Sequence, residues 1–315
     1  FPRFGITTTF ANATDPDAIA AAIQPNTKLI FGEVVGNPGL DIMDVDAVGK
    51  IADEAGIPLI LDATFNTPYL LKPLEHGASI IVHSLTKWIG GHGIAIGGAV
   101  LDGGRFDWGA SDKFPTIASP HYAMDGINFY EEFGPTAMTA KLRAEMMYNF
   151  GPCLSPTNAF HLLQGIETLP LRMQRHIENT DALLAYLSAH DDVAWVRHPH
   201  LESHPQHELA KRLMPKGAGS IITFGVKGGR DAGQAFIEAV ELSSHLANVG
   251  DAKTLVIHPA STTHSHIDPE AMKDGGLSDD MIRLSVGLED IEDIKADFEI
   301  GFKAAKRRMA PRAAE

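Results

Sequence analysis

The stretch of the sequence that most suggests chemistry is H-S-L-T-K at residues 83–87. It follows the apolar residues 80–82, so two hydroxyl groups and an amine stand where a buried strand should end. One interpretation is a strand that leaves the core through a polar turn, with the stem of Lys87 lying along the surface. The other is an amine held beside an anionic cofactor, whose phosphate Ser84 and Thr86 bind. Because S-x-T-K often occurs by chance, the motif alone leaves both open.

Asp62 is the second candidate, since it ends the apolar run of residues 57–61. A carboxylate there is costly unless a cation or a hydrogen-bond donor meets it. Asp62 either caps the next turn or pairs with a protonated ring nitrogen. Together, Asp62 and Lys87 match the needs of pyridoxal phosphate: the lysine binds it covalently, and the carboxylate keeps its pyridine nitrogen protonated so that the ring withdraws electrons. Free lysine has a pKa of ~10.4, so this lysine must be positioned and partly desolvated to react.

The elements that would position these residues alternate between strand and helix. We expect a helix from Asp44, where apolar residues recur at helical spacing, between strands over residues 28–35 and 57–62. Further strands are expected at 79–82 and 96–102. This order predicts right-handed crossovers and a mostly parallel sheet. Ligands of such sheets gather at the carboxyl ends of the strands, where Asn37, Asp62 and Lys87 stand.

The second half of the chain predicts a different organisation. Residues 102–154 are rich in loops and aromatic side chains, which suggests a lid or a subunit contact. A long helical region follows from Ser155, with an interruption near Pro170. Beyond it we expect strands at 193–198, 219–226 and 281–286, and helices at 204–213, 231–242 and 290–307. The fold class is therefore α/β, with a large domain over 1–168 and a smaller α+β domain over 169–315.

Composition excludes several classes of partner. The 315 residues carry a formal net charge of −14, which should repel nucleic acid and anionic membrane surfaces. No apolar run approaches the ~18 residues of a membrane span. The single cysteine, Cys153, rules out an internal disulfide and fits a reducing compartment such as the cytoplasm. Its apolar neighbours predict that Cys153 packs in the interior.

Five motifs in chain order resemble those of the Cys/Met-metabolism family of fold-type-I pyridoxal-phosphate enzymes. They are G-E-V-V-G-N-P at 32–38, L-I-L-D-A-T-F at 59–65, H-S-L-T-K-W-I-G-G-H-G at 83–93, H-P-A-S-T-T-H at 258–264 and I-R-L-S-V-G-L-E at 282–289. Within the family, the third motif and the long insertion resemble the O-acetylhomoserine sulfhydrylases. The fold that this resemblance implies is a large cofactor-binding domain with a smaller C-terminal domain.

The resemblance also implies which residues bind the cofactor. Lys87 would hold pyridoxal phosphate covalently and move protons, and Asp62 would pair with the pyridine nitrogen. Thr64 would lie near the ring, and Ser84 and Thr86 would hold the phosphate. The glycines of W-I-G-G-H-G are expected to form a tight loop after the lysine.

Three further residues would face the substrate. Asn37 would contact either the 3'-oxygen of the cofactor or the substrate carboxylate, and Ser261 would orient Lys87 or the substrate. Arg283 would bind the α-carboxylate through two hydrogen bonds. In M-I-R-L-S-V, alternation sets Arg283 and Ser285 on the strand face opposite Ile282 and Leu284. Without the family motif, an arginine on an exposed strand face would be the simpler interpretation.

A metal site is not expected. His258, His264 and His266 are close in sequence, but no acidic partner stands at a familiar metal-ligand spacing. A nucleotide site is disfavoured as well, because no glycine-rich phosphate loop opens any expected helix.

The implied activity is γ-replacement in methionine biosynthesis. O-acetyl-L-homoserine and sulfide, or methanethiol, would give L-homocysteine, or L-methionine, and acetate. The alternatives are cystathionine γ-synthase, cystathionine γ-lyase or methionine γ-lyase activity, and, outside enzymes, a cofactor-free scaffold chain. Sequence leaves the leaving group open between acetyl, succinyl and phosphoryl.

Family members also carry residues ahead of the point that aligns with Phe1. In the family this segment supplies a glycine-containing phosphate turn, a tyrosine that stacks on the ring, and a Tyr/Arg pair that reaches a neighbour's site. We therefore expect a missing N-terminal segment, and weak cofactor binding by the residues shown here. The resemblance further implies a homotetramer built from two dimers.

Overall fold

Short apolar runs in the first third of the chain form a four-stranded sheet in the order β1-β2-β3-β4. These strands are β1 (Ile30–Glu33), β2 (Leu59–Asp62), β3 (Ile80–Ser84) and β4 (Gly98–Asp102). The computed structural model describes residues 1–262 and 276–310. β1, β2 and β3 are parallel, whereas β4 pairs antiparallel with β3. The predicted mostly parallel sheet is confirmed, and β4 runs the other way because a turn, not a crossover helix, joins it to β3.

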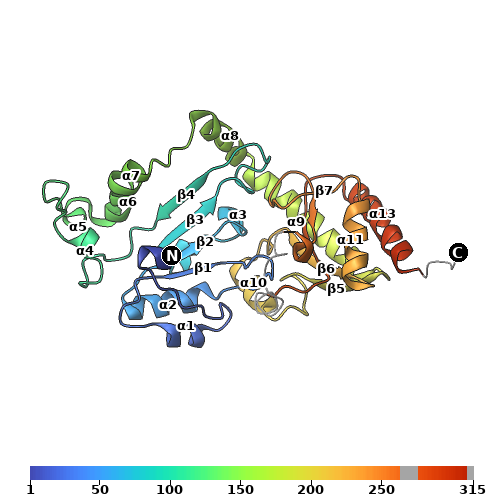
Figure 1. Ribbon diagram of the computed structural model, residues 1–315, viewed down its shortest axis with the longest axis horizontal. Helices are drawn as coiled ribbons and strands as arrows, with labels where there is room; N and C mark the ends of the chain where they lie inside the picture. The colour runs from blue at the N-terminus through green and yellow to red at the C-terminus, as the bar shows by residue number, and fades with distance from the viewer. Residues whose placement is uncertain (263–275, 311–315) are drawn as a thin grey trace.

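Capped helices make the crossovers of this sheet. α2 (Val45–Ala55) links β1 to β2; Asp44 caps its first turn, and Gly56 ends it in the left-handed conformation at φ 61°. α1 (Pro16–Ala22) begins after the capping residue Asp15 and packs beside α2 (Figure 1). The connection from β2 to β3 is shorter and holds only α3 (Thr67–Leu70) and η2 (Pro73–His76), while η1 (Pro2–Phe4) lies near the N-terminus.

Residues 102–154 are more helical than the sequence suggested. They form a set of short helical segments: α4 (Pro115–Ala118), α5 (Phe129–Phe133), η3 (Gly134–Thr136), α6 (Ala137–Lys141), the π-helical η4 (Leu142–Met147) and α7 (Tyr148–Phe150). Three aromatic rings, Phe106, Trp108 and Phe114, meet edge to face with centroids 4.8–5.4 Å apart and order the start of this region. The prediction for Cys153 is wrong, because its side chain is exposed just beyond α7.

The second sheet has five strands in the order β5-β6-β9-β8-β7. They are β5 (Val193–Arg197), β6 (Ile221–Val226), β7 (Ser244–His245), β8 (Leu255–Ile257) and β9 (Met281–Ser285). The helices of this part are α10 (His207–Leu213), α11 (Gly229–Ala239) and α13 (Ile291–Met309), and η5 (Pro259–Ser261) follows β8. All pairs in the sheet are antiparallel except β7 with β8. The expected smaller α+β part is confirmed, apart from β7 and β8, which the sequence did not indicate.

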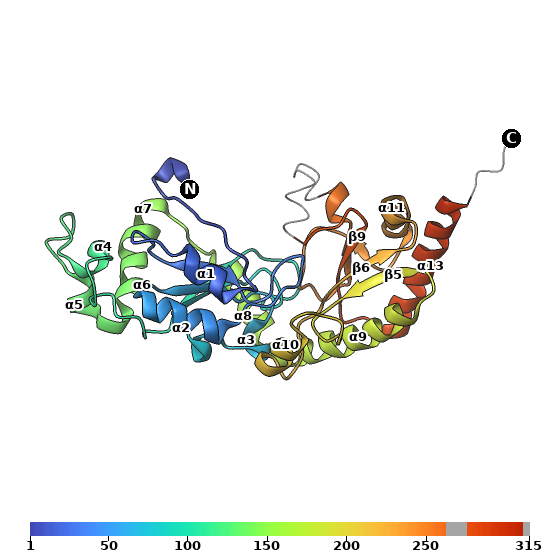
Figure 2. The same ribbon diagram turned by 90° about the horizontal axis from the view of Figure 1, so that it is seen from below.

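α9 (Leu169–Ala189) joins the two parts, and α8 (Pro156–Glu167) precedes it (Figure 2). The first half of α9 contributes Leu169 and Met173 to the hydrophobic core around the parallel sheet. Its second half contributes Leu183 and Leu187 to the core around the second sheet. One continuous helix thus belongs to both cores and fixes their relative position. A domain boundary at 168/169 remains a proposal. Among the described residues, no helix has the length and apolar character that crossing a membrane would require.

Candidate active site

Asp62 and Ser84 lie on one face of the parallel sheet, near the carboxyl ends of β2 and β3. In register, Asp62 pairs with Glu33 on β1 and with Val82 on β3, and residues in register share a face. Ser84 follows Val82 by two positions, so it lies on the same face. Asp62 and Ser84 are only partly buried, whereas Leu61 on the opposite face is fully buried. This face is therefore accessible to a ligand.

Hydrogen bonds join three of the predicted cofactor residues into one chain. The Thr64 amide donates to Asp62 Oδ1 at 2.8 Å, and Thr64 Oγ1 accepts from the Ser84 amide at 2.9 Å. In the described parts of the chain, the second carboxylate oxygen of Asp62 and the Ser84 hydroxyl make no hydrogen bond. Asp62 therefore retains an acceptor and Ser84 a donor, as a pyridinium and a phosphate would require.

Thr86 is placed differently from Ser84. Its Oγ1 accepts from the Gly97 amide at 3.1 Å and donates to the Gly97 carbonyl at 3.3 Å. The hydroxyl thus ties the turn after β3 to the start of β4. A role for Thr86 in binding phosphate stays a prediction, and it requires the hydroxyl to exchange its bond to the Gly97 carbonyl for one to the phosphate.

Lys87 lies in the turn after β3, and its side chain reaches the second part of the molecule. The amine Nζ donates to the side-chain oxygen Oδ1 of Asn248. Partial burial of the amine, and then the positive charge of Arg283, lower the pKa of Lys87. The tight glycine loop is confirmed, since Gly91 and Gly93 have φ of 71° and 65°.

Arg172 of α9 holds this turn in place through hydrogen bonds to its backbone. Its guanidinium donates to the carbonyls of Trp88 at 2.6 Å, Gly165 at 2.6 Å and Ile89 at 3.1 Å. Trp88, fully buried, also donates from its indole Nε1 to Ser220 Oγ at 2.8 Å. Arg172 therefore links the residues next to Lys87 to α9 and α8, and Trp88 links them to the residue before β6, which gives the lysine a rigid support.

Arg283 on β9 is buried, with 6% of its surface exposed. Its Nη1 donates to Asn37 Oδ1 at 3.1 Å, and its Nη2 donates to the Ala247 carbonyl at 2.8 Å. The interpretation of an exposed arginine is wrong, because the whole of β9 is buried. Burial also lowers the pKa of Arg283. In the described ranges no carboxylate pairs with it, and a buried cation among neutral acceptors is suited to bind an anionic group.

Glu33 is a residue of the site that the sequence analysis missed. Its Oε2 accepts from the Asn37 amide at 2.9 Å and so orients the residue that contacts Arg283. Part of Glu33 remains exposed. Burial of its carboxyl group raises the pKa of Glu33, the hydrogen bond from the Asn37 amide lowers it by less, and the negative charge of Asp62 raises it further. The sequence did contain a signal for it, because Glu33 is a carboxylate near the end of the predicted strand 28–35 and four positions before Asn37.

Ser261 is not joined to these groups by any contact in the described structure. Its Oγ lies 3.0 Å from His258 Nδ1 in the short helix η5, so its predicted role stays a prediction. His264 and His266 lie outside the described residues. Among the described residues, no group of three or more histidine, cysteine or acidic side chains could hold a metal ion.

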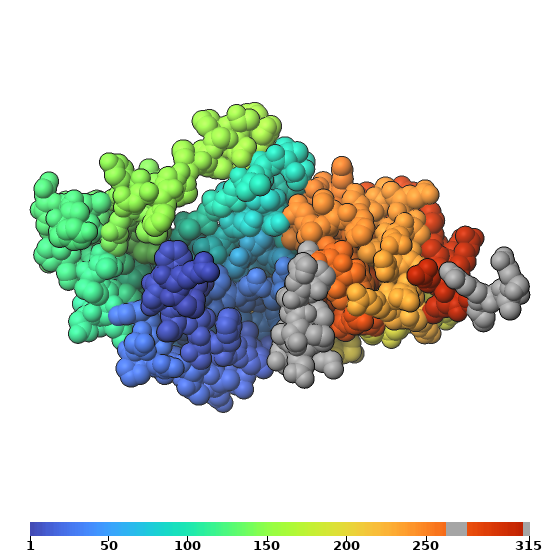
Figure 3. Space-filling model, in the orientation of Figure 1, coloured from blue at the N-terminus to red at the C-terminus, as the bar shows by residue number. Residues whose placement is uncertain are grey.

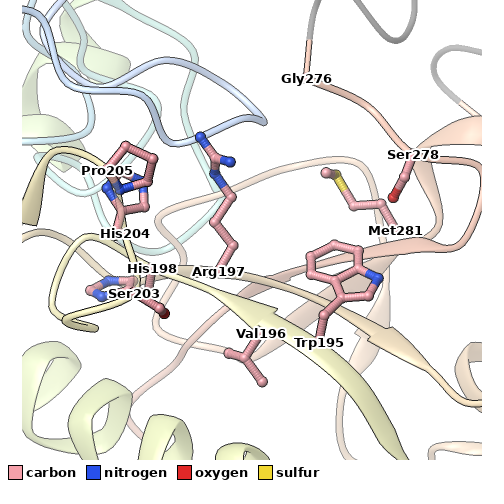
Figure 4. A pocket seen from close by; sticks show the side chains of 10 residues that line it. All are labelled: Trp195, Val196, Arg197, His198, Ser203, His204, Pro205, Gly276, Ser278 and Met281. Carbon is pink, nitrogen blue, oxygen red and sulfur yellow. The ribbon is translucent and has the colours of Figure 1, made fainter.

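A cavity beside β5 lies away from these residues (Figure 4). It has a volume of about 370 Å³, and its walls include Trp195, Arg197, His204 and Met281. None of the predicted site residues lines it. The site is instead recognised by its chemistry, because it combines an amine of lowered pKa, a strand-end carboxylate and a buried guanidinium. On a largely parallel sheet, this combination defines a pyridoxal-phosphate enzyme of the α/β class.

The family model described as Cys/Met metabolism PLP-dependent enzyme matches residues 1–303, and the chain belongs to this family. A homocysteine synthase from Schizosaccharomyces pombe is 46% identical over 96% of this chain and 71% of its own length. An O-acetyl-L-homoserine sulfhydrylase from Leptospira meyeri is 43% identical over 96% of this chain and 70% of its own.

A solved structure gives the same result for the fold. The putative O-acetylhomoserine (thiol)-lyase of Campylobacter jejuni superimposes with a TM-score of 0.92 at 34% identity, covering 96% of this chain and 72% of that one. That structure contains a pyridoxyl-lysine monophosphate. The cofactor of this family is pyridoxal phosphate, and Asp62, Ser84 and Lys87 offer the acceptor, donor and amine that it needs.

Proposed function

We propose that this protein replaces the acetoxy group at Cγ of O-acetyl-L-homoserine with sulfide, or with methanethiol. The products are L-homocysteine, or L-methionine, and acetate, and the place of the reaction is methionine biosynthesis. Two relatives that align with almost the whole chain are a homocysteine synthase and an O-acetyl-L-homoserine sulfhydrylase, which supports this choice of reaction.

The observation that carries the proposal is the placement of Lys87 and Arg283 on either side of Asn248. The amine contacts the Asn248 side chain, and the guanidinium donates to the carbonyl of Ala247 and, at 3.4 Å, to that of Asn248. An α-amino acid carries its carboxylate and its amino group on one carbon atom. A carboxylate bound at Arg283 therefore brings the Cα of the substrate towards the amine of Lys87.

Each residue then has a defined task. Pyridoxal phosphate, when bound, withdraws electrons from the substrate. Asp62 would accept a hydrogen bond from its ring nitrogen, and Ser84 would donate one to its phosphate. Arg283 binds the substrate carboxylate, while Asn37, oriented by Glu33, donates from its side-chain amide to the same ligands.

Lys87 moves the protons. Its lowered pKa favours the neutral amine, which is the form that accepts a proton. Nζ takes the proton from Cα and then exchanges protons at Cβ, so that acetate leaves from Cγ and the sulfur nucleophile adds there. A half-buried position keeps this amine out of bulk water and close to the substrate.

The test is a measurement of homocysteine formation by purified protein supplied with pyridoxal phosphate, O-acetyl-L-homoserine and sulfide. We expect turnover that Lys87→Ala abolishes and that the variant of an exposed lysine, Lys227→Ala, retains. Thiol release from methionine or cystathionine without γ-replacement would assign a lyase instead. A protein that binds the cofactor but forms no homocysteine would refute the proposal.

We also propose that the protein is a homotetramer of two dimers in the cytoplasm. Large apolar side chains project from α7 and α8, among them Tyr148, Phe150, Phe160 and Leu163, which are 59–84% exposed. The segments that contain α7 and α8 form the yellow-green region at the upper edge of the molecule (Figure 3). Sedimentation at micromolar concentration is expected to give four chains, and Phe160→Glu with Leu163→Glu to give fewer; a monomer in both cases would contradict the assembly.

A further inference from the structure

A turn formed by residues 36–41 carries Asn37, and an arginine of the second part of the molecule holds this turn. We propose that this arginine, Arg197 on β5, is a positioning residue: its guanidinium binds the Asn37 turn at two points and so fixes where the Asn37 side chain lies. Arg197 is outside the five motifs of the sequence. The consequence for catalysis rests on the proposed function, in which Asn37 contacts the ligands, but the contacts of Arg197 do not.

The Asn37 turn presents one residue and buries those that follow it. The Gly36 amide donates to the Asp41 carbonyl at 2.9 Å, and the Leu40 amide donates to the Gly36 carbonyl at 2.9 Å. Asn37 is exposed, whereas the three residues after it are buried. Leu40 has φ 62°, a left-handed conformation that a bulky side chain adopts only when its surroundings impose it. The turn therefore depends on contacts from outside to keep its shape.

Arg197 supplies two of these contacts. Its Nε donates to the Gly39 carbonyl at 2.6 Å, and its Nη2 donates to Asp41 Oδ1 at 2.5 Å. Figure 4 shows the side chain extending from β5 towards the pale blue loop of the first part. The Arg197 and Asp41 side chains are 35% and 40% exposed, so water weakens the attraction between their charges. The planar guanidinium nevertheless holds the turn on both sides of Leu40, which a single amine could not do.

The register of the second sheet places Arg197 and Arg283 in one row. Arg197 pairs with Thr223 on β6, and Thr223 pairs with Arg283 on β9. Residues in register share a face, and neighbouring strands lie about 4.8 Å apart, so the two arginines are about 10 Å apart on one face. Arg283 donates to the Asn37 side chain at 3.1 Å, while Arg197 holds the far end of the same turn. Two arginines of one sheet thus fix the turn at its two ends.

Another arginine joins the two parts of the molecule without contacting the Asn37 turn. Arg212 on α10 forms ion pairs with Asp44, at 3.0 Å, and with Asp46, at the start of α2. Both Arg197 and Arg212 therefore connect the second part to the first, but only Arg197 binds residues of the turn. An effect that is particular to Arg197 reports the position of Asn37 and not the general attachment of the two parts.

Hydrogen–deuterium exchange of the purified protein tests the positioning without any turnover. The amides of Gly36 and Leu40 are bonded within the turn, so the exchange rate of the peptide that contains residues 36–41 reports how often the turn opens. We expect Arg197→Gln to increase this rate about tenfold or more, since two hydrogen bonds of a charged donor are lost. The matched control Arg212→Gln should stay within about twofold of the wild type. An unaltered rate in folded Arg197→Gln would overturn the proposal.

Steady-state kinetics of the protein loaded with pyridoxal phosphate test the consequence for the substrate. Arg197→Gln should raise KM for O-acetyl-L-homoserine about fivefold or more while kcat stays within about threefold, because the turn helps to bind the amino acid and Lys87 still moves the protons. Arg212→Gln should retain both values. A wild-type KM in Arg197→Gln, or a kcat that falls as much as KM rises, would overturn the positioning role.

A second variant decides the question if Arg197→Gln does not fold. Asp41→Ala removes one of the two acceptors from the first part, and it should also increase exchange of the turn and raise KM. Wild-type exchange and a wild-type KM in Asp41→Ala would contradict the proposal. The exchange measurement separates this inference from the proposed function, because its outcome is decided even if the protein makes no homocysteine.

Discussion

At the scale of the residue, the proposed chemistry depends on two basic side chains of one site, Lys87 and Arg283. Arg283 is buried among amide and carbonyl oxygens, and its charge adds to burial in lowering the pKa of Lys87. In the proposed function, the substrate carboxylate binds Arg283 and supplies the missing negative charge. This proposal predicts recognition through hydrogen bonds whose geometry a planar guanidinium matches and a lysine does not.

Arg283→Lys tests this recognition. It keeps the charge but loses the paired hydrogen bonds, each worth about 1.5–3 kcal/mol to a charged ligand, so KM for O-acetyl-L-homoserine should rise about 10- to 100-fold. Steady-state kinetics with saturating sulfide measure this value. The matched control is the exposed Arg307→Lys on α13, for which KM should not change. A wild-type KM in Arg283→Lys would mean that the carboxylate binds elsewhere.

Sequence could predict single residues only where local pattern carries the information. Lys87, Asp62 and Arg283 stand in motifs at strand ends or within a strand, and the structure places them at the carboxyl edge and on β9. Asn248 could not be found, because its partner is 161 residues away and its own loop has no pattern. The burial of Arg283 also depends on both faces of β9 being covered, which alternation within one strand does not reveal.

At the scale of the element, the site consists of two backbone segments. One is the turn after β3 that carries Lys87, and the other is the loop after β7 that carries Asn248. They approach so closely that glycine is required at their contact. Gly250 has φ 73°, and an added Cβ would lie 2.6 Å from the backbone nitrogen of Trp88. Neither segment can shift without moving the other.

Gly250→Ala should therefore destabilise the fold more than its backbone conformation alone explains. A matched control exists in Gly229→Ala, since Gly229 has a similar φ of 68° but nothing within 4 Å of an added Cβ. We expect a loss of about 1 kcal/mol in unfolding free energy for the control and about 2–4 kcal/mol for Gly250→Ala. Urea unfolding measures both. Equal losses would show that the two segments are not in tight contact.

Elements were predictable where they are apolar and continuous. β2, β3, β6 and β9 were found because their runs are buried, whereas β7 and β8 have only two and three residues and exist through their neighbours. Residues 102–154 were expected to be loop-rich because their short helices lack a repeated apolar stripe. Packing among Phe106, Trp108 and Phe114 contributes order that periodicity does not show.

At the scale of the whole molecule, buried neutral histidines couple stability to pH. Burial lowers the pKa of His176 to about 4 and that of His198 to about 3. In the unfolded chain each would titrate near 6.5. Because the unfolded state binds these protons first, the stability that these two histidines contribute is fully present above pH 6.5 and is lost as the pH falls towards 4.

His198→Gln should reduce this pH dependence. For each such histidine, lowering the pH from 7 to 5 reduces the free energy of unfolding by about 2 kcal/mol. The decrease in the variant should therefore be smaller than in the wild type by about 2 kcal/mol. Urea unfolding at the two pH values gives the difference for wild type and variant. The exposed His245→Gln is the control and should behave as wild type does. An identical pH dependence in His198→Gln would show that His198 does not stay neutral in the fold.

The central claim is that Lys87 is the residue to which pyridoxal phosphate binds. The most direct measurement is to incubate the purified protein with the cofactor, reduce it with borohydride, digest it and locate the pyridoxyl group by mass spectrometry. We predict a stoichiometric pyridoxyl group on the peptide that contains Lys87, and none in Lys87→Ala. A pyridoxyl group distributed over exposed lysines, with none on Lys87, would contradict the account.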